Sequence, residues 1–458
     1  MITRADVVAR VREWGLSEEV VEKDYVLGWL LWGIGADPDL GPAWAFKGGT
    51  CLKKCYIETY RFSEDLDFTL VRGLAPDEAT ASVALLRVLG RVGQESGIDF
   101  SARAPKLRLR PGGTSIEGRV YYRGPRNAPG EASVKIDLSL TEVVACPTVL
   151  RTISHPFPDT LPAPAQVRCY SFDEVFAEKL RAMGERGRPR DLYDIVNLYR
   201  RSDLRAHGPL IKAVLSEKCQ SKNVTMPDLD AVQTAATRTG LETEWSNMLA
   251  HQLQALPPFE PFWDELPGLF AWLDGAEVGA ALPAYPVAIN DDQSWTPPPT
   301  IWTWGAGVPL ESIRFAAANR LCVELGYQGS VRTIEPYSLR RSRDGHLLLH
   351  AIRADSREHR SYRVDGITSV RATNRPFRPV YAVEFAAAGP MFAAPSRAGY
   401  RTARRTYGGS RTAYILQCGY CDRTFRRSTR TTELRAHKDA DGYPCAGRHG
   451  YVIDEVAG

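Results

Sequence analysis

The stretch "FKGGTCLKKCYIETYRFSEDLDFTL", residues 46–70, constrains the fold of this chain more than any other segment. It opens with Gly48 and Gly49 and ends with Asp65 and Asp67 in a segment that alternates as a strand. Glycines let the backbone approach phosphate oxygens, and a helix after such a turn points its N-terminus at the anion. Aspartates two residues apart on a strand share a face, where they can hold hard cations. The stretch predicts a nucleotide site, with a plain turn and a solvated strand as the alternative.

Other residues supply what this stretch lacks for phosphoryl or nucleotidyl transfer, namely further carboxylates and cations. Asp137 lies at the centre of the strand expected at 132–140. The segment 172–201 reads as two helices separated by a Gly/Pro break. Its charged residues flank this break: Lys179, Arg181, Arg188, Arg190, Asp191 and Asp194. Charges on such helices are usually solvated, but two helix ends that meet at a break can bring them to one cleft.

A chain of 458 residues is too long for one compact core, so several domains are expected. The predicted order is a transferase-type domain at 1–275, a linker at 276–305, an α+β domain at 306–385, a linker at 386–412 and a cysteine-containing domain at 413–458. In the α+β domain we expect a helix at 310–327. Strands are expected to follow at 332–342, 346–354 and 360–373.

The distribution of charged residues and the length of the apolar runs indicate which kinds of partner the protein can have. The net charge of +4 is mild, but basic residues gather between 397 and 438, where a polyanion would be attracted. The longest apolar run, residues 26–35, is too short to span a bilayer, and no signal peptide is recognised. We therefore expect a cytoplasmic protein with nucleic acid rather than a membrane as its partner. In that reducing compartment, clustered cysteines suggest a metal before a disulfide.

The cysteines cluster near the C-terminus. Cys418 and Cys421 form a Cys-x-x-Cys pair, His437 follows a run that reads as helical, and Cys445 follows a Gly-Tyr-Pro turn. Thiolate and imidazole ligands at this spacing suit tetrahedral Zn²⁺, and Phe425 and Leu434 would supply a small core. The alternatives are His449 as the fourth ligand, or reduced thiols on a disordered tail. The other cysteines are expected to be small core residues: Cys51, Cys55, Cys146, Cys169, Cys219 and Cys322.

The motifs "FKGGTCLKKCY", "RFSEDLDF" and "EKLRA…RPRDLYDI" resemble those of the AbiEii/AbiGii toxin family of nucleotidyltransferases, which includes the mycobacterial MenT toxins. The resemblance covers roughly residues 10–275. It implies an α+β protein with a DNA-polymerase-β-like nucleotidyltransferase core and a helical second lobe. It also implies a Mg²⁺-dependent enzyme that uses a nucleoside triphosphate, with an RNA acceptor such as the tRNA 3′ end and a possible antitoxin partner.

The resemblance also implies roles for individual residues. Gly48, Gly49 and Thr50 would hold the triphosphate, and Asp65 and Asp67 would bind Mg²⁺ with Asp137 as the third carboxylate. Lys179 would neutralise phosphate charge, and Asp191 would complete the catalytic set, supported by Arg190 and Asp194. Arg190 and Ser63 would also face the nucleotide. In some relatives a serine at the position of Ser63 is phosphorylated; the alternative role for Ser63 is a turn cap.

Residues 332–377 resemble a WYL domain, an Sm-like small β-barrel. The Trp-Tyr-Leu that names that family is replaced here by Leu347, Leu348 and Leu349. A groove for nucleic acid or a nucleotide is expected from four residues: Tyr337, Arg353, Arg360 and Arg363. The alternative is a scaffolding barrel whose arginines are solvated.

Together these patterns predict a nucleotidyltransferase toxin of an abortive-infection or toxin–antitoxin module that acts in phage defence. It would transfer nucleotides from a triphosphate to RNA. The alternative is a regulator whose transferase fold is inactive and which binds nucleic acid or a nucleotide through its WYL-like and zinc-finger domains. The filled set of charged positions favours the enzyme.

Overall fold

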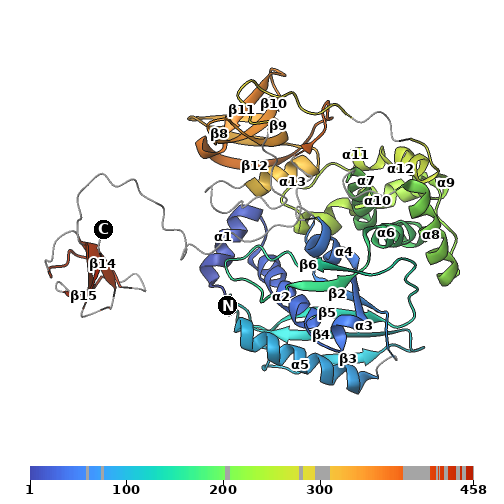
Figure 1. Ribbon diagram of the computed structural model, residues 1–458, viewed down its shortest axis with the longest axis horizontal. Coiled ribbons are helices and arrows are strands. Elements are labelled where there is room, and N and C mark those ends of the chain that lie inside the picture. Colours follow the sequence, from blue (N-terminus) through green and yellow to red (C-terminus); the bar gives the residue numbers. More distant parts are fainter. Residues whose placement is uncertain are drawn as a thin grey trace. The chain divides into compact units, whose positions relative to one another are not determined.

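The structure is a computed structural model (Figure 1). It describes residues 1–57, 61–73, 77–201, 207–277, 282–293, 310–384, 413–418, 421, 423–427, 432–439, 444–445 and 450–456. The expected linker at 386–412, much of that at 276–305, and His449 lie outside these residues. The chain divides into two compact units, Met1–Ser396 and Arg397–Gly458, which are described separately.

The first unit is built on a seven-stranded mixed sheet with the order β3-β4-β5-β2-β1-β7-β6. The strands are β1 (Trp44–Lys47), β2 (Asp65–Leu70), β3 (Lys106–Leu109), β4 (Ser115–Tyr122), β5 (Ala132–Ser139), β6 (Val149–Thr152) and β7 (Gln166–Cys169). β2 pairs with β5, and β1 with β7, in parallel; the other pairs are antiparallel. β3 and β4 form an antiparallel hairpin.

Helices α1 (Arg4–Trp14), α2 (Glu18–Gly35), α3 (Leu40–Ala43) and α5 (Glu78–Ser96) belong to this half of the unit. The Ser17 hydroxyl accepts a hydrogen bond from the Val20 amide and caps the start of α2. Every residue from Val26 to Ile34 is buried, which explains the apolar run. α5 packs on α2 and β3 (Figure 1). Among the described residues, no helix has both the length and the apolar character needed to cross a bilayer.

The glycine turn leads from β1 into two short helical segments, α4 (Gly48–Cys51) and the π-helical η1 (Leu52–Tyr56). Gly48 has φ of +79°, a backbone conformation that disfavours any residue with a Cβ atom. The turn, the short helical segment and the strand therefore follow one another in the predicted order, and β1, which was not predicted, precedes them.

A helical lobe follows the sheet (Figure 1). Its helices are α6 (Phe172–Arg186), α7 (Pro189–Arg200), α8 (Gly208–Lys222), α9 (Leu229–Val232), α10 (Ala235–Leu249), η2 (Ala250–Gln252), α11 (Glu260–Trp263) and α12 (Leu266–Leu273). Gly187 ends α6 in the left-handed conformation, and Pro189 begins α7 where its missing amide hydrogen costs nothing. The predicted break between two helices is confirmed.

The first unit also contains α13 (Leu310–Ala318) and a five-stranded antiparallel sheet with the order β11-β10-β9-β8-β12. The strands are β8 (Leu321–Tyr327), β9 (Ser330–Arg341), β10 (Leu347–Arg353), β11 (His359–Arg363) and β12 (Ile367–Pro376), with a 3₁₀ turn, η3 (Val364–Gly366), before β12. Helix α13 packs on this sheet (Figure 1). No pairing joins β11 to β12 within the described part of the chain, so this sheet is not a closed barrel there.

Two predictions for this sheet were wrong. The helix predicted at 310–327 ends at Ala318, because Arg320 adopts φ of +55° and Leu321–Tyr327 pairs as β8. The segment 360–373, predicted as one strand, is divided by η3 into β11 and β12. Tyr285, within the segment expected as a linker, is buried in the core of this sheet, so we propose that the second domain begins near residue 282.

The second unit is a three-stranded sheet with the order β14-β13-β15. The strands are β13 (Ala413–Cys418), β14 (Thr424–Arg427) and β15 (Gly450–Val456). Residues 432–439 contain no helix, so the helical run predicted before His437 is wrong. Leu416, Leu434, Cys418 and Cys445 form the buried core, with Phe425 packed against it.

Candidate functional site

Three predicted carboxylates lie on the adjacent parallel strands β2 and β5. Asp67 stands opposite Asp137 in the register, and Asp65 precedes Asp67 on the same face of β2. The pKa of Asp67 is raised to about 6: burial is the largest cause, the charges of Asp65 and Asp137 act in the same direction, and Lys47 and Lys179 oppose the rise. The sheet register therefore brings together the three carboxylates that the sequence singled out.

The glycine turn lies directly against this carboxylate cluster. A Cβ atom on Gly48 would stand 2.5 Å from Oδ2 of Asp67, so no side chain fits there. A Cβ atom on Gly49 would stand 2.8 Å from Nη2 of Arg61 and 3.1 Å from Oγ of Ser63. The two glycines thus keep the backbone close both to a carboxylate and to a guanidinium group.

The Thr50 side chain is buried and contacts Asp65. Its hydroxyl donates a 2.6 Å hydrogen bond to the backbone carbonyl of Asp65. This bond ties α4 to the start of β2. Thr50 thus positions Asp65, whereas the resemblance implied a direct contact with the triphosphate.

The carboxylate of Asp194 pairs with two cationic side chains beside the glycine turn. The Arg61 guanidinium donates a bidentate pair of bonds to its carboxylate, at 2.7 and 2.8 Å, and Nζ of Lys179 lies 2.9 Å from Oδ2. Arg61 also donates to Oε1 of Gln252 at 3.0 Å. The sequence analysis did not single out Arg61, although this residue opens the quoted motif "RFSEDLDF".

Asp191 and Arg190 lie on the first turn of α7 and face different partners. The Asp191 carboxylate is buried and accepts two 2.8 Å bonds from Arg186. Burial lowers the pKa of Arg190, and Arg61 lowers it further, while Asp194, Asp65 and Glu64 oppose this. The Nε atom of Arg190 has no hydrogen-bond partner among the described residues. Arg190 is therefore the more available cation near Asp65, and Asp191 is held by Arg186.

Ser63 is half-buried and its hydroxyl faces Gly49. Among the described residues, the Ser63 hydroxyl makes no hydrogen bond of the kind that a turn cap makes. A phosphate on Ser63 would stand at the glycine turn, beside the aspartates.

Behind the turn, Lys47 reaches two carboxylates of the interior. Its Nζ lies 3.3 Å from Glu178 and 3.9 Å from Glu142. Burial alone would lower the pKa of Lys47, but these two carboxylates raise it above its ordinary value. Burial would likewise raise the pKa of Glu178, yet Lys47, Lys218, Arg181 and Lys179 lower it to about 2. The charged side chains in the interior next to the glycine turn are therefore paired with groups of opposite charge.

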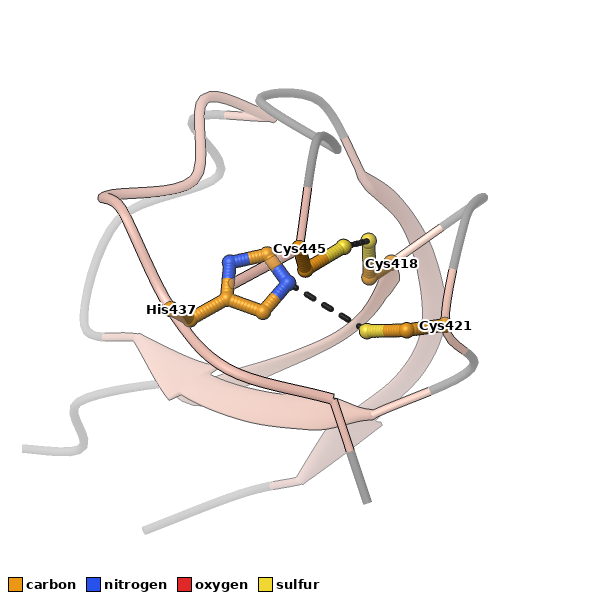
Figure 2. Close-up of side chains that lie close together, drawn as sticks. All are labelled: Cys418, Cys421, His437 and Cys445. Atoms are coloured by element: carbon orange, nitrogen blue, oxygen red, sulfur yellow. Dashed lines mark hydrogen bonds between the residues drawn. The ribbon is translucent and has the colours of Figure 1, made fainter. Parts of the chain in front are cut away.

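In the second unit, the four predicted zinc ligands come together (Figure 2). One ligand atom from each of Cys418, Cys421, His437 and Cys445 lies within 4.8 Å of the others. The sulfurs of Cys418 and Cys445 are 3.9 Å apart, and Nε2 of His437 lies 3.3 Å from the sulfur of Cys421. Nδ1 of His437 lies 2.9 Å from the Arg435 carbonyl, which suits a donated hydrogen bond that leaves Nε2 free to ligate.

Both donor sets contain the ligand types that the predicted metals prefer. Of these two sets of described residues, only the Cys/His set brings its ligand atoms within 4.8 Å of one another, whereas the carboxylates share a face of the sheet. Three carboxylates on one face offer the hard oxygen ligands that Mg²⁺ prefers. Three thiols and an imidazole whose ligand atoms lie this close together could hold a metal ion, and this donor set suits a closed tetrahedral Zn²⁺ site.

The groove predicted on the second sheet does not form from its four residues. Tyr337 is fully buried, with its hydroxyl near Glu335. Each of the three arginines instead donates to an acidic residue two positions away along the chain: Arg353 to Asp355, Arg360 to Glu358 and Arg363 to Asp365. Tyr337 therefore belongs to the core of the sheet, and the three arginines belong to local ion pairs.

Paired aspartates on a central strand, a third carboxylate on its parallel neighbour and a glycine turn against them define a nucleotidyltransferase-like core. The family model described as nucleotidyl transferase AbiEii toxin, type IV toxin–antitoxin system, matches residues 29–269, more than half of the chain. The chain belongs to this family. No curated protein matches it.

Solved structures give weaker likenesses. The nucleotidyltransferase toxin MenT4 from Mycobacterium tuberculosis H37Rv is 20% identical over 60% of this chain and 91% of that one, with a TM-score of 0.44. An antigenic nucleotidyltransferase-like protein from Paracoccidioides brasiliensis is 14% identical over 48% and 93%, with a TM-score of 0.25. Proteasome accessory factor B/C of Arthrobacter aurescens is 18% identical over 36% and 24%, with a TM-score of 0.15.

Proposed function

We propose that this protein is a Mg²⁺-dependent nucleotidyltransferase toxin that transfers nucleotides from a nucleoside triphosphate to RNA, with the tRNA 3′ end as the acceptor. One observation carries the proposal: Asp65, Asp67 and Asp137 share one face of β2 and β5, against the Gly48–Gly49 turn. A type IV toxin–antitoxin family further suggests an antitoxin partner.

The carboxylates of Asp65, Asp67 and Asp137 would hold Mg²⁺, which supplies charge neutralisation and orientation to phosphates when bound. Thr50 keeps Asp65 in place through its bond to the Asp65 carbonyl. Gly48 keeps the Asp67 carboxylate free of any neighbouring Cβ atom. These residues would therefore fix where the α-phosphate lies.

Cations of the helical lobe would hold the rest of the triphosphate. Arg190 has an unbonded Nε near Asp65, and Lys179 and Arg61 meet at Asp194 beside Gly49. Asp194 would keep these two side chains extended toward the turn, and the Asp191–Arg186 pair would hold the first turn of α7. In the reaction, the RNA 3′-hydroxyl oxygen bonds to the α-phosphorus and the bond to pyrophosphate breaks.

The remaining domains are proposed as a WYL-type module and a zinc-binding module. The WYL-type assignment is supported by a helix followed by five antiparallel strands, with the fifth strand paired to the first. The zinc assignment is supported by the clustering of Cys418, Cys421, His437 and Cys445. The exposed Arg423 and Arg426 flank the zinc ligands and are consistent with a nucleic-acid contact.

Growth on induced expression tests the toxin proposal. The wild-type protein is expected to arrest growth, and Asp65→Ala to relieve the arrest at equal protein level. Asp264→Asn, a change at an exposed aspartate of the helical lobe, is the matched control and should remain toxic. Equal toxicity of the wild type and Asp65→Ala would contradict the proposal.

A further inference from the structure

A groove lies between the helical lobe and the five-stranded sheet. Its volume is about 620 Å³. Ala255 and Leu256 contribute from the chain after η2, and Arg371, Thr373, Asn374 and Arg375 contribute from β12. The groove thus exists only because the second sheet packs beside the catalytic domain.

The two walls of this groove differ in chemistry. The β12 wall offers guanidinium, hydroxyl and amide groups, joined by the Glu324 carboxylate from β8 and Thr333 from β9, whereas Ala255 and Leu256 make the other wall apolar. Arg371 is engaged by Glu324, with Nε 3.0 Å from Oε2. Arg375 is exposed and forms no ion pair with any residue in the described ranges. Arg375 is therefore the cation most available to a ligand that enters.

Cationic and hydrogen-bonding groups facing an apolar wall suit a single strand of nucleic acid. Guanidinium and amide groups contact phosphates, and the apolar surface contacts sugars and bases. A purely anionic small ligand would need no apolar wall. The composition of the groove therefore favours a polynucleotide.

The apolar wall continues toward the candidate active site. Ala255 and Leu256 follow Gln252 at the end of η2. The Gln252 carbonyl accepts from the Phe62 amide at 3.0 Å, and its side chain accepts from Arg61 at 3.0 Å. Arg61 in turn stands over Gly49. One short segment therefore joins the groove to the glycine turn.

We propose that this groove binds the backbone of the RNA acceptor and leads its 3′ end to the carboxylate cluster. The inference rests on the proposed function, because it names where that reaction's second substrate lies. Arg375 contacts a phosphate, and Leu256 contacts the neighbouring sugar or base.

Charge reversal at Arg375 tests the inference. In transfer assays with tRNA, Arg375→Glu is expected to raise the KM for RNA on the order of tenfold. The slope of log RNA affinity against log salt concentration should become shallower by about one, because one phosphate contact is lost. The kcat at saturating RNA and the KM for the triphosphate should be unchanged. Arg378→Glu, at an exposed arginine three positions on and outside the groove, is the matched control. Equal KM values for the two variants overturn the inference.

A second measurement separates this inference from the proposed function. The Asp65→Ala protein is mixed with tRNA that contains 4-thiouridine and is irradiated, and the crosslinked peptides are identified. Crosslinks within 250–257 or 371–375 support the groove, even if the wild type transfers no nucleotide and the proposed function fails. Crosslinks confined to other segments, or no RNA binding, overturn the groove while leaving transfer to be judged by its own assay.

Discussion

The phenolic hydroxyl of Tyr193 donates a 2.8 Å hydrogen bond to Oδ1 of Asn319, and both side chains are buried. Tyr193 lies between Asp191 and Asp194 on α7, and Asn319 directly follows α13. On its other side, α13 presents Glu311 to the charge of Lys53, three residues after Thr50. The segment at the end of α13 is therefore hydrogen-bonded to α7 through Asn319, and Glu311 of α13 lies within electrostatic range of Lys53.

Loss of this hydrogen bond should loosen the junction. Tyr193→Phe leaves Oδ1 of Asn319 buried without its donor, at a cost of about 1–3 kcal/mol in the free energy of unfolding. In a double-mutant cycle with Asn319→Ala, the two losses should not add, with a coupling of about 1 kcal/mol. Denaturant unfolding measures both values. Additive losses would show that the two residues act independently.

The cysteine cluster should bind about one zinc per chain. Cys445→Ser is expected to abolish the zinc found by metal analysis of the purified protein, whereas Cys146→Ser, outside the cluster, should retain it. Chelation should unfold the second unit, because its small core surrounds the ligands.

Two histidine variants identify the fourth ligand. His437→Ala should lose the metal, and His449→Ala should keep it. The reverse result would assign the ligand to His449, and a metal-free protein with a folded second unit would refute zinc altogether.

The α1–α13 junction should respond to pH through Glu13. The pKa of this carboxyl is raised from 4.5 to about 8; burial is the largest cause and Glu311 acts in the same direction, although Arg10 opposes the rise. Between these values the folded protein holds a proton that the unfolded chain has lost, so this group's contribution to stability falls as pH rises. Glu13→Gln cannot ionise. Its melting temperature relative to the wild type should therefore increase from pH 5 to pH 8; a constant difference would contradict the assignment.

Gly48→Ala should remove activity through contact with Asp67 rather than through backbone strain alone. The added Cβ atom would meet Oδ2 of Asp67 at 2.5 Å. Gly112→Ala is the matched control, because Gly112 also has positive φ but open space around it. Both variants should lose about 1 kcal/mol of stability. Only Gly48→Ala should lose nucleotidyl transfer, and equal activity of the two would exclude the contact as the cause.

Sequence patterns predicted the parts of the site that are local in the chain. The glycine turn, the Asp65–Asp67 alternation and the break at Gly187 each follow from the conformational preferences of a few neighbouring residues. The Cys-x-x-Cys pair likewise predicted a ligand cluster, because few other roles suit clustered thiols in a reducing compartment.

What the sequence did not show depends on tertiary contacts. Arg61 belongs to the site only because α7 brings Asp194 to it, and Asp191 pairs with Arg186, a contact that the sequence analysis did not single out. The helix predicted through Tyr327 failed because pairing with β9 outweighs local helical preference after Arg320. Tyr337 reads as an available aromatic, but the fold buries it.

The most direct test of the central claim is nucleotide transfer by purified protein. The protein is incubated with each α-³²P-labelled nucleoside triphosphate, Mg²⁺ and total tRNA, and the RNA is resolved on a gel. The account predicts label on RNA with at least one triphosphate, loss of that label with Asp67→Asn, and full label with the control Asp264→Asn. No transfer from any triphosphate, or unchanged transfer by Asp67→Asn, would contradict it.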